Sequence, residues 1–459
     1  MKRIIAYLLV AAMLLIVMPF AMSGCSDGTD ESSIEGAPNE SGEPEESGTT
    51  EDGDDMTVIK NDPNYTNVAL NKPYTKCDAH ADYPDTNNAI LTDGSVAAKD
   101  AKYSDDAFMA FHKGQEFYKQ NSYAEVTVDL GEVYYLDKFV AHLGSKYFSS
   151  VGIAAPELVR VYLSNDGKEW YKAGITVHKD TDATNTVAST LEFEGAYTAR
   201  YVQYRFIGGV SNWMFVSELE AYGIKADEAK PYPETQKALN YLFIGNSSTY
   251  FFNVPDKLAL IAESVGIELN VTYFQTGGAY LSQFADPSDT ARGFLLRSTL
   301  AQNKYDVIVL QDNSNADYDD SKAAMDKLVP VLKKAQPDAE LMLYERYSSN
   351  TDPNQRPISG KRLHNAYTQL AKDFDIEKNA HVVDAFLLCY EKYPNIVLHH
   401  TDNSHHSEIG AYLIASVMAI EYLGINLDEV SYTGGNDDAT VAALKEIAKL
   451  ACETGYVFK

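Results

Sequence analysis

Cysteine, tryptophan and basic side chains are all scarce in this chain of 459 residues, which holds four Cys and two Trp. Lysine and arginine number 38 against 66 aspartates and glutamates, so the formal net charge is −28. This acidic balance argues against nucleic acid and anionic membrane surfaces as partners. Apart from Cys25, the cysteines are Cys77, Cys389 and Cys452, and no pair has metal-ligand spacing. Cys389 and Cys452 could pair, but the interpretation is three buried thiols.

Much of the negative charge lies in one segment near the start of the chain. Between Cys25 and Met56 every charged residue is acidic, twelve in all, which leaves about −16 for the rest of the chain. The segment is otherwise Gly, Ser and Pro with almost no large apolar residue, so it cannot bury enough surface to fold. Like charges keep such a chain extended. Residues 25–62 are therefore predicted to be a disordered acidic linker.

The first residues have the pattern of a targeting signal. Lys2 and Arg3 precede an apolar run over residues 4–22, which Ser23-Gly24-Cys25 follows. Small residues directly before a cysteine resemble the cleavage box of bacterial lipoproteins. The resemblance implies a signal peptide over residues 1–24, a lipid on Cys25 and a membrane-anchored, extracytoplasmic protein on the bacterial cell surface. An ordinary signal peptide or an uncleaved anchor is the alternative.

Residues 63–225 are predicted to form a β-sandwich. Short runs with alternating apolar and polar residues occur at 123–130, 158–163 and 200–206, and turn residues separate them. No long run with helical periodicity interrupts them. An antiparallel all-β sandwich is the fold that such a pattern favours.

Six strings in this segment resemble the factor V/VIII type C (discoidin) domain, a jelly-roll family that includes many bacterial carbohydrate-binding modules. They are NVALNKPYT at 67–75, LTDG at 91–94, VDLGE at 128–132, YLSNDGKEW at 162–170, ARYV at 199–202 and SELEAYG at 217–223. The resemblance implies a glycan as ligand and a possible structural calcium. Asp93 and Glu218 offer the oxygen ligands that calcium prefers. A turn-forming Asp93 and a solvated Glu218 are the alternative.

In that family, loops at one end of the barrel bind the ligand. The matching loop here, residues 103–118, offers Phe108, Phe111 and His112 to stack on a sugar face, and it lacks tryptophan. Core packing of these aromatic residues is the alternative.

The remaining residues, 238–459, follow a proline-containing linker at 226–237 and alternate between strand-like and helix-like patterns. Strands are expected at 240–244, 269–274, 306–310, 340–344 and 381–383, and helices at 255–265, 321–335, 360–373, 406–423 and 438–453. Apolar strands with crossover helices predict a parallel sheet covered on both faces. Functional residues of such sheets gather at the carboxyl ends of the strands.

Three residues in this part of the chain could form a catalytic set. Ser247 follows the first strand, while Asp402 lies three residues before His405, ahead of a late helix. A serine hydroxyl becomes a nucleophile when a base takes its proton, and the base needs a group to orient it. The placement favours a serine hydrolase.

Four strings resemble the SGNH/GDSL hydrolases in order: LFIGNSST at 242–249, the Gly277-Gly278 turn, VIVLQDNS at 307–314, and Asp402-x-x-His405. The resemblance implies a three-layer, flavodoxin-like α/β domain in which Ser247 is the nucleophile, His405 the base and Asp402 its orienting carboxylate. The oxyanion hole would combine the amides of Ser247 and Gly278 (or Gly277) with the side chain of Asn313, or of Gln311 instead. Two positions depart from the family: Asn246 replaces the usual Asp, and residues 311–314 read QDNS where the family commonly has Gly-x-Asn-Asp.

Other polar residues near these motifs are interpreted differently. His399, His400, His405 and His406 surround Asp402, but their spacing does not favour zinc, and His399 and His406 are expected to pack or to face substrate. Glu345 and Arg346 end a strand near the same edge and are expected to be solvated charges.

Together the two domains predict a surface-anchored serine esterase that removes O-acyl groups, notably O-acetyl groups, from complex glycans, with no cofactor for catalysis. A non-catalytic glycan-binding or adhesion lipoprotein is the main alternative, and acyl transfer is the second.

Overall fold

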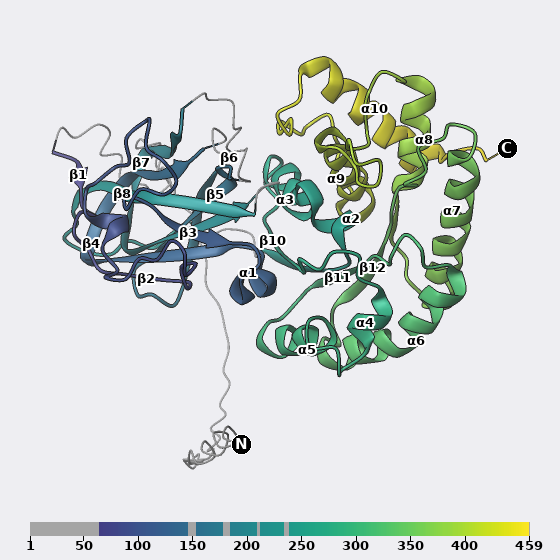
Figure 1. The fold of residues 1–459 in the computed structure, drawn as a ribbon, viewed down its shortest axis with the longest axis horizontal. Coiled ribbons are helices and arrows are strands. Elements are labelled where there is room, and N and C mark those ends of the chain that lie inside the picture. Colours follow the sequence, from purple (N-terminus) through teal and green to yellow (C-terminus); the bar gives the residue numbers. More distant parts are fainter. Residues whose placement is uncertain (1–63, 146–152, 178–183, 209–211, 234–237, 459) are drawn as a thin grey trace, which may run out of the picture. The chain divides into compact units, whose positions relative to one another are not determined.

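The computed structural model describes residues 64–145, 153–177, 184–208, 212–233 and 238–458 (Figure 1). The proposed signal peptide, Cys25 and the acidic linker fall outside these residues. By its internal contacts the chain divides into residues 1–53 and 54–459, and every described residue belongs to the second unit. No helix in the described part of the chain is long and apolar enough to cross a membrane.

The first domain is built from antiparallel strands. They are β1 (Thr66–Asn67), β2 (Tyr74–Lys76), β3 (Met109–His112), β4 (Ala124–Gly144), β5 (Pro156–Ser164), β6 (Tyr171–Val177), β7 (Thr186–Gly208) and β8 (Trp213–Lys225). The sheet has the order β1-β8-β4-β7-β5-β6, with β2 on β4 and β3 on β8. Alternate side chains of β4 such as Val126, Val128 and Leu130 enter the core, as period-two patterning requires. Two short elements were not expected: η1 (Ile90–Thr92) and α1 (Glu116–Asn121).

The second domain contains a parallel sheet of five strands. They are β9 (Leu239–Ile244), β10 (Leu269–Tyr273), β11 (Val307–Leu310), β12 (Glu340–Glu345) and β13 (Asn379–His381), in the order β10-β9-β11-β12-β13. This second-first-third-fourth-fifth order is one of the two common doubly wound arrangements. The expected combination of a β-rich domain with a parallel α/β domain is therefore confirmed.

Helices cover both faces of this sheet. They are α2 (Ser247–Tyr250), η3 (Phe251–Asn253), α3 (Val254–Glu263), α4 (Leu281–Ala285), α5 (Gly293–Gln302), α6 (Tyr318–Ala335), α7 (Arg356–Asp373), α8 (Val382–Lys392), α9 (Glu408–Leu423) and α10 (Asp438–Thr454). Successive residues of β12 enter different cores: Met342 and Tyr344 pack with residues of α3, α8, α9 and α10, whereas Leu341 and Leu343 pack with residues of α4 to α7.

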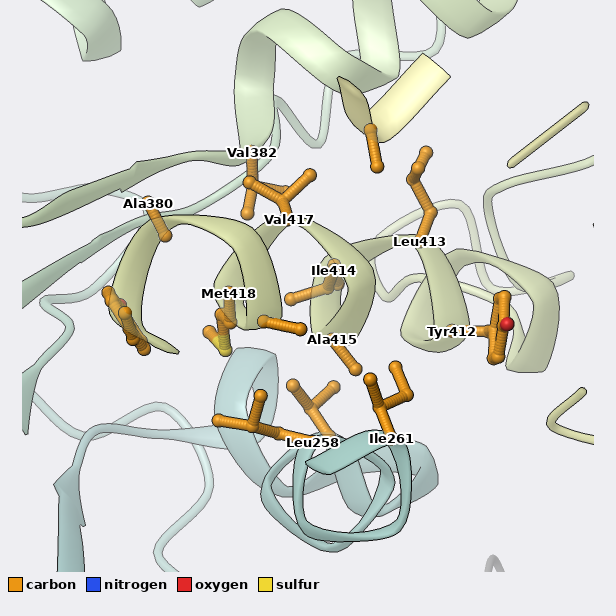
Figure 2. Close-up of a cluster of buried hydrophobic side chains, with 14 of the residues drawn as sticks. Leu258, Ile261, Ala380, Val382, Tyr412, Leu413, Ile414, Ala415, Val417 and Met418 are labelled. Carbon is orange, nitrogen blue, oxygen red and sulfur yellow. The ribbon is translucent and has the colours of Figure 1, made fainter. Parts of the chain in front are cut away.

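Helix α9 lies at the centre of the first of these cores. Its residues 410–419 are all buried, and Figure 2 shows Leu258 and Ile261 of α3 beside it. The Ser407 hydroxyl accepts a hydrogen bond from the Gly410 amide at the start, and Gly424 ends the helix in the left-handed conformation that glycine tolerates. A helix that is apolar on all sides belongs in the interior.

The sequence prediction was wrong at 381–383 and missed three helices of this domain. Strand β13 ends at His381, and α8 begins at Val382. A short continuous apolar run does not distinguish a buried strand from a buried helix, so the β13–α8 boundary was misplaced. Helices α4 and α5 were not predicted either.

Within the unit of residues 54–459, buried polar contacts join β5 to the segment that begins α3. The Arg160 guanidinium lies 2.7 Å from the Asp256 carboxylate, and both side chains are almost fully buried. Glu157 accepts hydrogen bonds from the Lys257 ammonium at 2.5 Å and from the Asn253 side chain at 2.6 Å. Charges this deeply buried are tolerated because each has its partner.

Candidate active site

The turn that carries Ser247 is held by buried side chains. Asn246 is 3% exposed and caps α2: its Oδ1 accepts from the Ser248 amide at 3.0 Å, and its Nδ2 donates to the Ala279 carbonyl at 3.0 Å. Gln311 Oε1 accepts from the Asn246 amide and from the Thr249 hydroxyl, both at 3.0 Å. The position of Ser247 is thus fixed by residues that follow β10 and β11.

The structure brings the three residues of the predicted triad together. His405 Nε2 lies 2.8 Å from Ser247 Oγ, and His405 Nδ1 lies 2.8 Å from Asp402 Oδ2. Ser247 and His405 are 158 positions apart in sequence. With Nδ1–H donating to the carboxylate, Nε2 is left to accept the proton of the serine hydroxyl. The arrangement can therefore activate Ser247 as a nucleophile.

The loop around Asp402 keeps its carboxylate ionised. Although partial burial opposes the charge, hydrogen bonds from the amides of His405 and Ser404 and from the side chains of His405 and His400 hold the pKa of Asp402 well below its usual value. A hydrogen bond from the His400 amide to the His405 carbonyl, at 2.8 Å, closes the loop. Hydrogen bonds to the charged form are a standard way to lower a carboxyl pKa.

Phe251 covers the imidazole of His405. Its ring stacks on His405 with centroids 4.4 Å apart and 23° between planes. The next two residues, Phe252 and Asn253, have φ of 49° and 51°, a left-handed conformation that costs energy for residues other than glycine. His406 Nε2 donates to the Phe251 carbonyl at 2.7 Å and so holds this turn in place. Sequence reasoning missed Phe251.

His399 and His406 pack inside the domain. Both are buried; His399 contacts the Tyr390 hydroxyl and the Ser348 carbonyl, and burial lowers the pKa of His406 to about 3. His406 is therefore neutral, and its proton lies on Nε2, which donates to the Phe251 carbonyl. Of the two expected roles, packing or facing substrate, the structure shows packing for both histidines.

Of the predicted oxyanion-hole groups, the amides of Ser247 and Gly278 are available. Among the hydrogen bonds of the described residues, none has either amide as donor. Gly278 is exposed and has φ of 63°. The Asn313 side chain is 8% exposed, and its Nδ2 donates to the Gly278 carbonyl at 2.7 Å and approaches the Ala279 carbonyl at 3.5 Å. Asn313 therefore shapes the Gly278 turn in this conformation.

The alternative role of Gln311 in the oxyanion hole was wrong. Its side chain is 1% exposed, its Nε2 donates to the Asp312 carbonyl, and its Oε1 holds the Ser247 turn. Asp312 was not singled out from the sequence, yet its carboxylate accepts from the amides of Leu281 and Asn313 and from the Ser321 hydroxyl. Burial raises the pKa of Asp312, and these donors oppose that rise.

In the β-rich domain, two of the three predicted ligand-binding residues belong to the core. Phe108 and Phe111 are 3% and 0% exposed, so neither presents a ring face to a ligand. Only His112 is partly accessible, and it lies beside Trp213 with ring centroids 4.5 Å apart. His80 contacts the same tryptophan at 4.6 Å. The tryptophan absent from the 103–118 loop is thus supplied by β8, which pairs with β3.

Glu218 fits a cation site better than it fits a solvated surface position. It is 0% exposed; its Oε1 accepts from the Gly94 amide at 3.1 Å, while its buried Oε2 has no partner. Burial, together with the nearby charge of Asp93, raises the pKa of Glu218 to about 7. The alternative of a solvated Glu218 is therefore wrong. Asp93 itself is exposed.

All three cysteines in the described part of the chain are free thiols. Cys389 is buried, and Cys77 and Cys452 are half-buried. The open possibility of a Cys389–Cys452 disulfide is not realised.

No protein-family model and no curated protein matches this sequence. Among solved structures, the chain is similar to a DUF4886 family protein from Bacteroides uniformis, at 19% identity and a TM-score of 0.42, over 48% of this chain and 98% of that one. It is also similar to a family 32 carbohydrate-binding module from Clostridium perfringens, at 12% identity and a TM-score of 0.26, over 34% of this chain and 97% of that one. A fucose-binding module from Streptococcus pneumoniae is similar at 15% identity and a TM-score of 0.25, over 35% of this chain and 99% of that one. Similarities this low assign neither a family nor an activity.

Asn246→Asp is expected to destabilise the fold by about 1–3 kcal/mol, because a carboxylate cannot donate to the Ala279 carbonyl and would face it unpaired. The measurement is urea unfolding. Asn426→Asp is the matched control, since exposed Asn426 also accepts from the amide two residues on and also donates a side-chain hydrogen bond. It should change stability by less than about 0.5 kcal/mol. Equal effects in both variants would contradict a special role for the buried amide.

Proposed function

We propose that this chain is a serine ester hydrolase that removes O-acyl groups, most simply O-acetyl groups, from glycans. The observation that carries the proposal is the chain of contacts from Ser247 Oγ to His405 Nε2 and from His405 Nδ1 to Asp402, both at 2.8 Å. It lies next to the carboxyl end of β9, where open α/β sheets place their ligands. The resemblance of residues 242–249 and 402–405 to the SGNH hydrolases supports the same reaction.

The geometry suits a two-step acyl transfer to water. Ser247 Oγ would attack the acyl carbon while its proton passes to His405 Nε2. The amides of Ser247 and Gly278 would stabilise the resulting oxyanion. Collapse would expel the sugar oxygen, which takes the proton from His405 and leaves as a hydroxyl. Water, deprotonated by His405, would then release the acyl group from Ser247 as a free acid.

A glycan substrate is supported by the β-rich domain. Its sequence resembles discoidin-type modules, and His80, His112 and Trp213 form a partly accessible aromatic cluster on it. Aromatic faces are apolar surfaces against which a sugar ring can pack. The lipid anchor at Cys25 would hold both domains at the outer face of a membrane.

The proposal is tested with the full chain and two substrates, p-nitrophenyl acetate and an acetylated xylan. Release of p-nitrophenolate and of acetate is expected from both, together with labelling of one residue by a fluorophosphonate probe, mapped to the Ser247 peptide. If neither substrate turns over and the probe does not react, the chain is not a serine esterase.

A non-catalytic glycan-binding lipoprotein is the second candidate. The observation that favours it is the Asn313 side chain, whose amide donates to the Gly278 carbonyl and not toward Ser247. Saturable binding of glycans without turnover or probe labelling would establish this function in place of the first.

Calcium is expected to raise the melting temperature of the full chain, and more at pH 8 than at pH 5. The buried Glu218 carboxylate would hold it, with Asp93 as the second oxygen ligand. Burial raises the pKa of Glu218 in the folded chain to about 7. Between the unfolded and the folded pKa, the Glu218 carboxyl is therefore protonated in the folded chain and ionised in the unfolded chain. Without calcium, this group's contribution to stability therefore falls as pH rises from about 4.5 to 7, and at low pH the proton competes with the ion.

The measurement is scanning calorimetry with calcium and with EDTA. Glu218→Gln should abolish the calcium shift, whereas Glu220→Gln, two residues along β8, should keep it. A shift of the same size in wild type and Glu218→Gln would place calcium elsewhere.

A further inference from the structure

Four ionisable side chains that the triad does not use meet at the carboxyl ends of β12 and β13, between α7 and α8. Glu345 ends β12 and His381 ends β13, while His364 lies in α7 and Asp384 in the first turn of α8. The Tyr344 hydroxyl reaches the Ser248 carbonyl, so the next side chain, Glu345, points to the opposite face. Both Glu345 and Arg346 were expected to be solvated charges; they are 0% and 3% exposed, and that expectation was wrong.

Several polar atoms of this cluster lie close together but make no hydrogen bond with one another. His364 Nδ1 lies 3.3 Å from Asp384 Oδ1 and 3.5 Å from Glu345 Oε1. These three buried atoms, and Asn379 Oδ1 beside them, have no partner in hydrogen-bond alignment. The second oxygen of each carboxylate is engaged: Glu345 Oε2 lies 2.5 Å from His381 Nδ1 and 3.3 Å from Asn379 Nδ2, and Asp384 Oδ2 accepts from the Tyr456 amide. Buried polar atoms are normally paired, so an unpaired group of this size needs an explanation.

The cluster also carries two buried carboxylates. Asp384 is 1% exposed and Glu345 is 0% exposed. In the described part of the chain, the ion pairs of these carboxylates are with His364 and His381 alone. Carboxylates removed from water need positive charge nearby. Two neutral imidazoles and two carboxylates would be balanced by one doubly charged cation.

We propose that Glu345, His364, His381 and Asp384 form a binding site for one divalent transition-metal ion of the Zn²⁺ class. Imidazole nitrogen and carboxylate oxygen are the ligands such ions take, at about 2.0–2.2 Å. Tetrahedral bonds of that length separate neighbouring ligand atoms by roughly 3.3–3.5 Å. The distances from His364 Nδ1 to Asp384 Oδ1 and to Glu345 Oε1, 3.3 and 3.5 Å, fall in this range. The ligand atoms of Glu345, His364 and His381 all lie within 4.8 Å of one another.

The ion would stabilise structure close to the active site without taking part in its chemistry. It would join β12 and β13 to α7 and α8, and Asp384 Oδ2 also accepts from the Tyr456 amide of the C-terminal segment at 3.1 Å. Two residues beyond Glu345, the Tyr347 hydroxyl accepts from the His406 amide at 2.9 Å and donates to the Ser404 carbonyl at 3.3 Å. These two residues flank His405.

One of the four proposed ligands, His381, lines a surface pocket. This pocket of about 490 Å³ is also lined by Asn379 and Glu421 among other residues. The ion would bind neutral imidazole nitrogens and ionised carboxylates, so protons compete with it for these ligands. Binding is therefore best measured at pH 8, where the protons compete less than at neutral pH.

The test is a titration of the EDTA-stripped full chain with Zn²⁺, followed by calorimetry and native mass spectrometry. One ion per chain is expected. Its affinity should fall by more than about 100-fold in His364→Ala and in His381→Ala. His142→Ala is the matched control, because His142 pairs with a single carboxylate, that of Glu220, at 3.0 Å. It should bind Zn²⁺ as the wild type does.

A second measurement needs no variant. Co²⁺ added to the stripped wild-type chain is expected to give the intense visible absorption of a tetrahedral site, and Zn²⁺ should abolish it. If the wild type takes up neither ion saturably, or if folded His364→Ala and His381→Ala bind Zn²⁺ as tightly as the wild type, the site does not exist. Neither result depends on whether Ser247 hydrolyses esters.

Discussion

Ser247→Ala is expected to lower kcat for ester hydrolysis by about 10⁴-fold or more. The Ser247 hydroxyl oxygen is the atom that would bond to the acyl carbon. Its proton is the one that His405 Nε2, 2.8 Å away, would remove. Residual catalysis would come from the amides of Ser247 and Gly278, which the substitution retains. The measurement is steady-state hydrolysis of p-nitrophenyl acetate, with acetate release from acetylated xylan alongside.

Ser248→Ala is the matched control for this substitution. It removes a hydroxyl one position along the same helix, where the side chain hydrogen-bonds to Tyr347 and not to His405. A loss of less than about tenfold is expected, the size of one hydrogen bond. Comparable losses in the two variants would mean that Ser247 is not the nucleophile, and an unchanged rate in Ser247→Ala would show that hydrolysis occurs elsewhere.

Asp402→Asn is expected to lower kcat by about 10⁴-fold at neutral pH while leaving the loop folded. Asp402 Oδ1 accepts hydrogen bonds from the backbone amides of Ser404 and His405, both at 2.9 Å. An asparagine side chain retains an oxygen for these two hydrogen bonds. It no longer holds the His405 Nδ1–H with a charge, so the imidazole can adopt the tautomer that cannot take the serine proton. The measurement is kcat and KM for the same ester from pH 5 to pH 9.

The pH profile also tests the ionisation of Asp402. Since hydrogen bonds hold its pKa well below the usual value, Asp402 stays charged across this whole range, and any loss of rate toward pH 5 belongs to another group. Asp428→Asn, which removes an exposed carboxylate paired with Lys449, should leave the profile unchanged. A wild-type rate in Asp402→Asn at any pH would remove Asp402 from the mechanism.

The sequence predicted those parts of the site that depend on short-range pattern. Ser247 follows an apolar strand, and Asp402 and His405 share one loop, so spacing and strand order were enough to bring them together. Gln311 was harder, because only the folded chain shows its side chain holding the amide of Asn246. The same holds for Trp213, which reaches His112 through the pairing of β3 with β8.

Long-range packing explains the remaining differences. Glu345 reads as a charge at the end of a strand, and neither His364 nor His381 has metal-ligand spacing with it in the sequence. Only the arrangement of β12, β13 and α7 brings these three residues together. Helix α8 was missed because Val382 and Val383 continue the apolar pattern expected of a strand. Periodicity cannot report on contacts that the tertiary fold creates.

The left-handed pair Phe252–Asn253 places backbone strain directly beside the candidate active site. Two consecutive non-glycine residues in that conformation raise the energy of the folded state, and the strain is tolerated because the turn presents Phe251 to His405. Engineering for heat resistance usually begins by relaxing such positions. Here a relaxed turn would release the ring that covers the proposed general base, His405, so stabilising changes belong elsewhere in the chain.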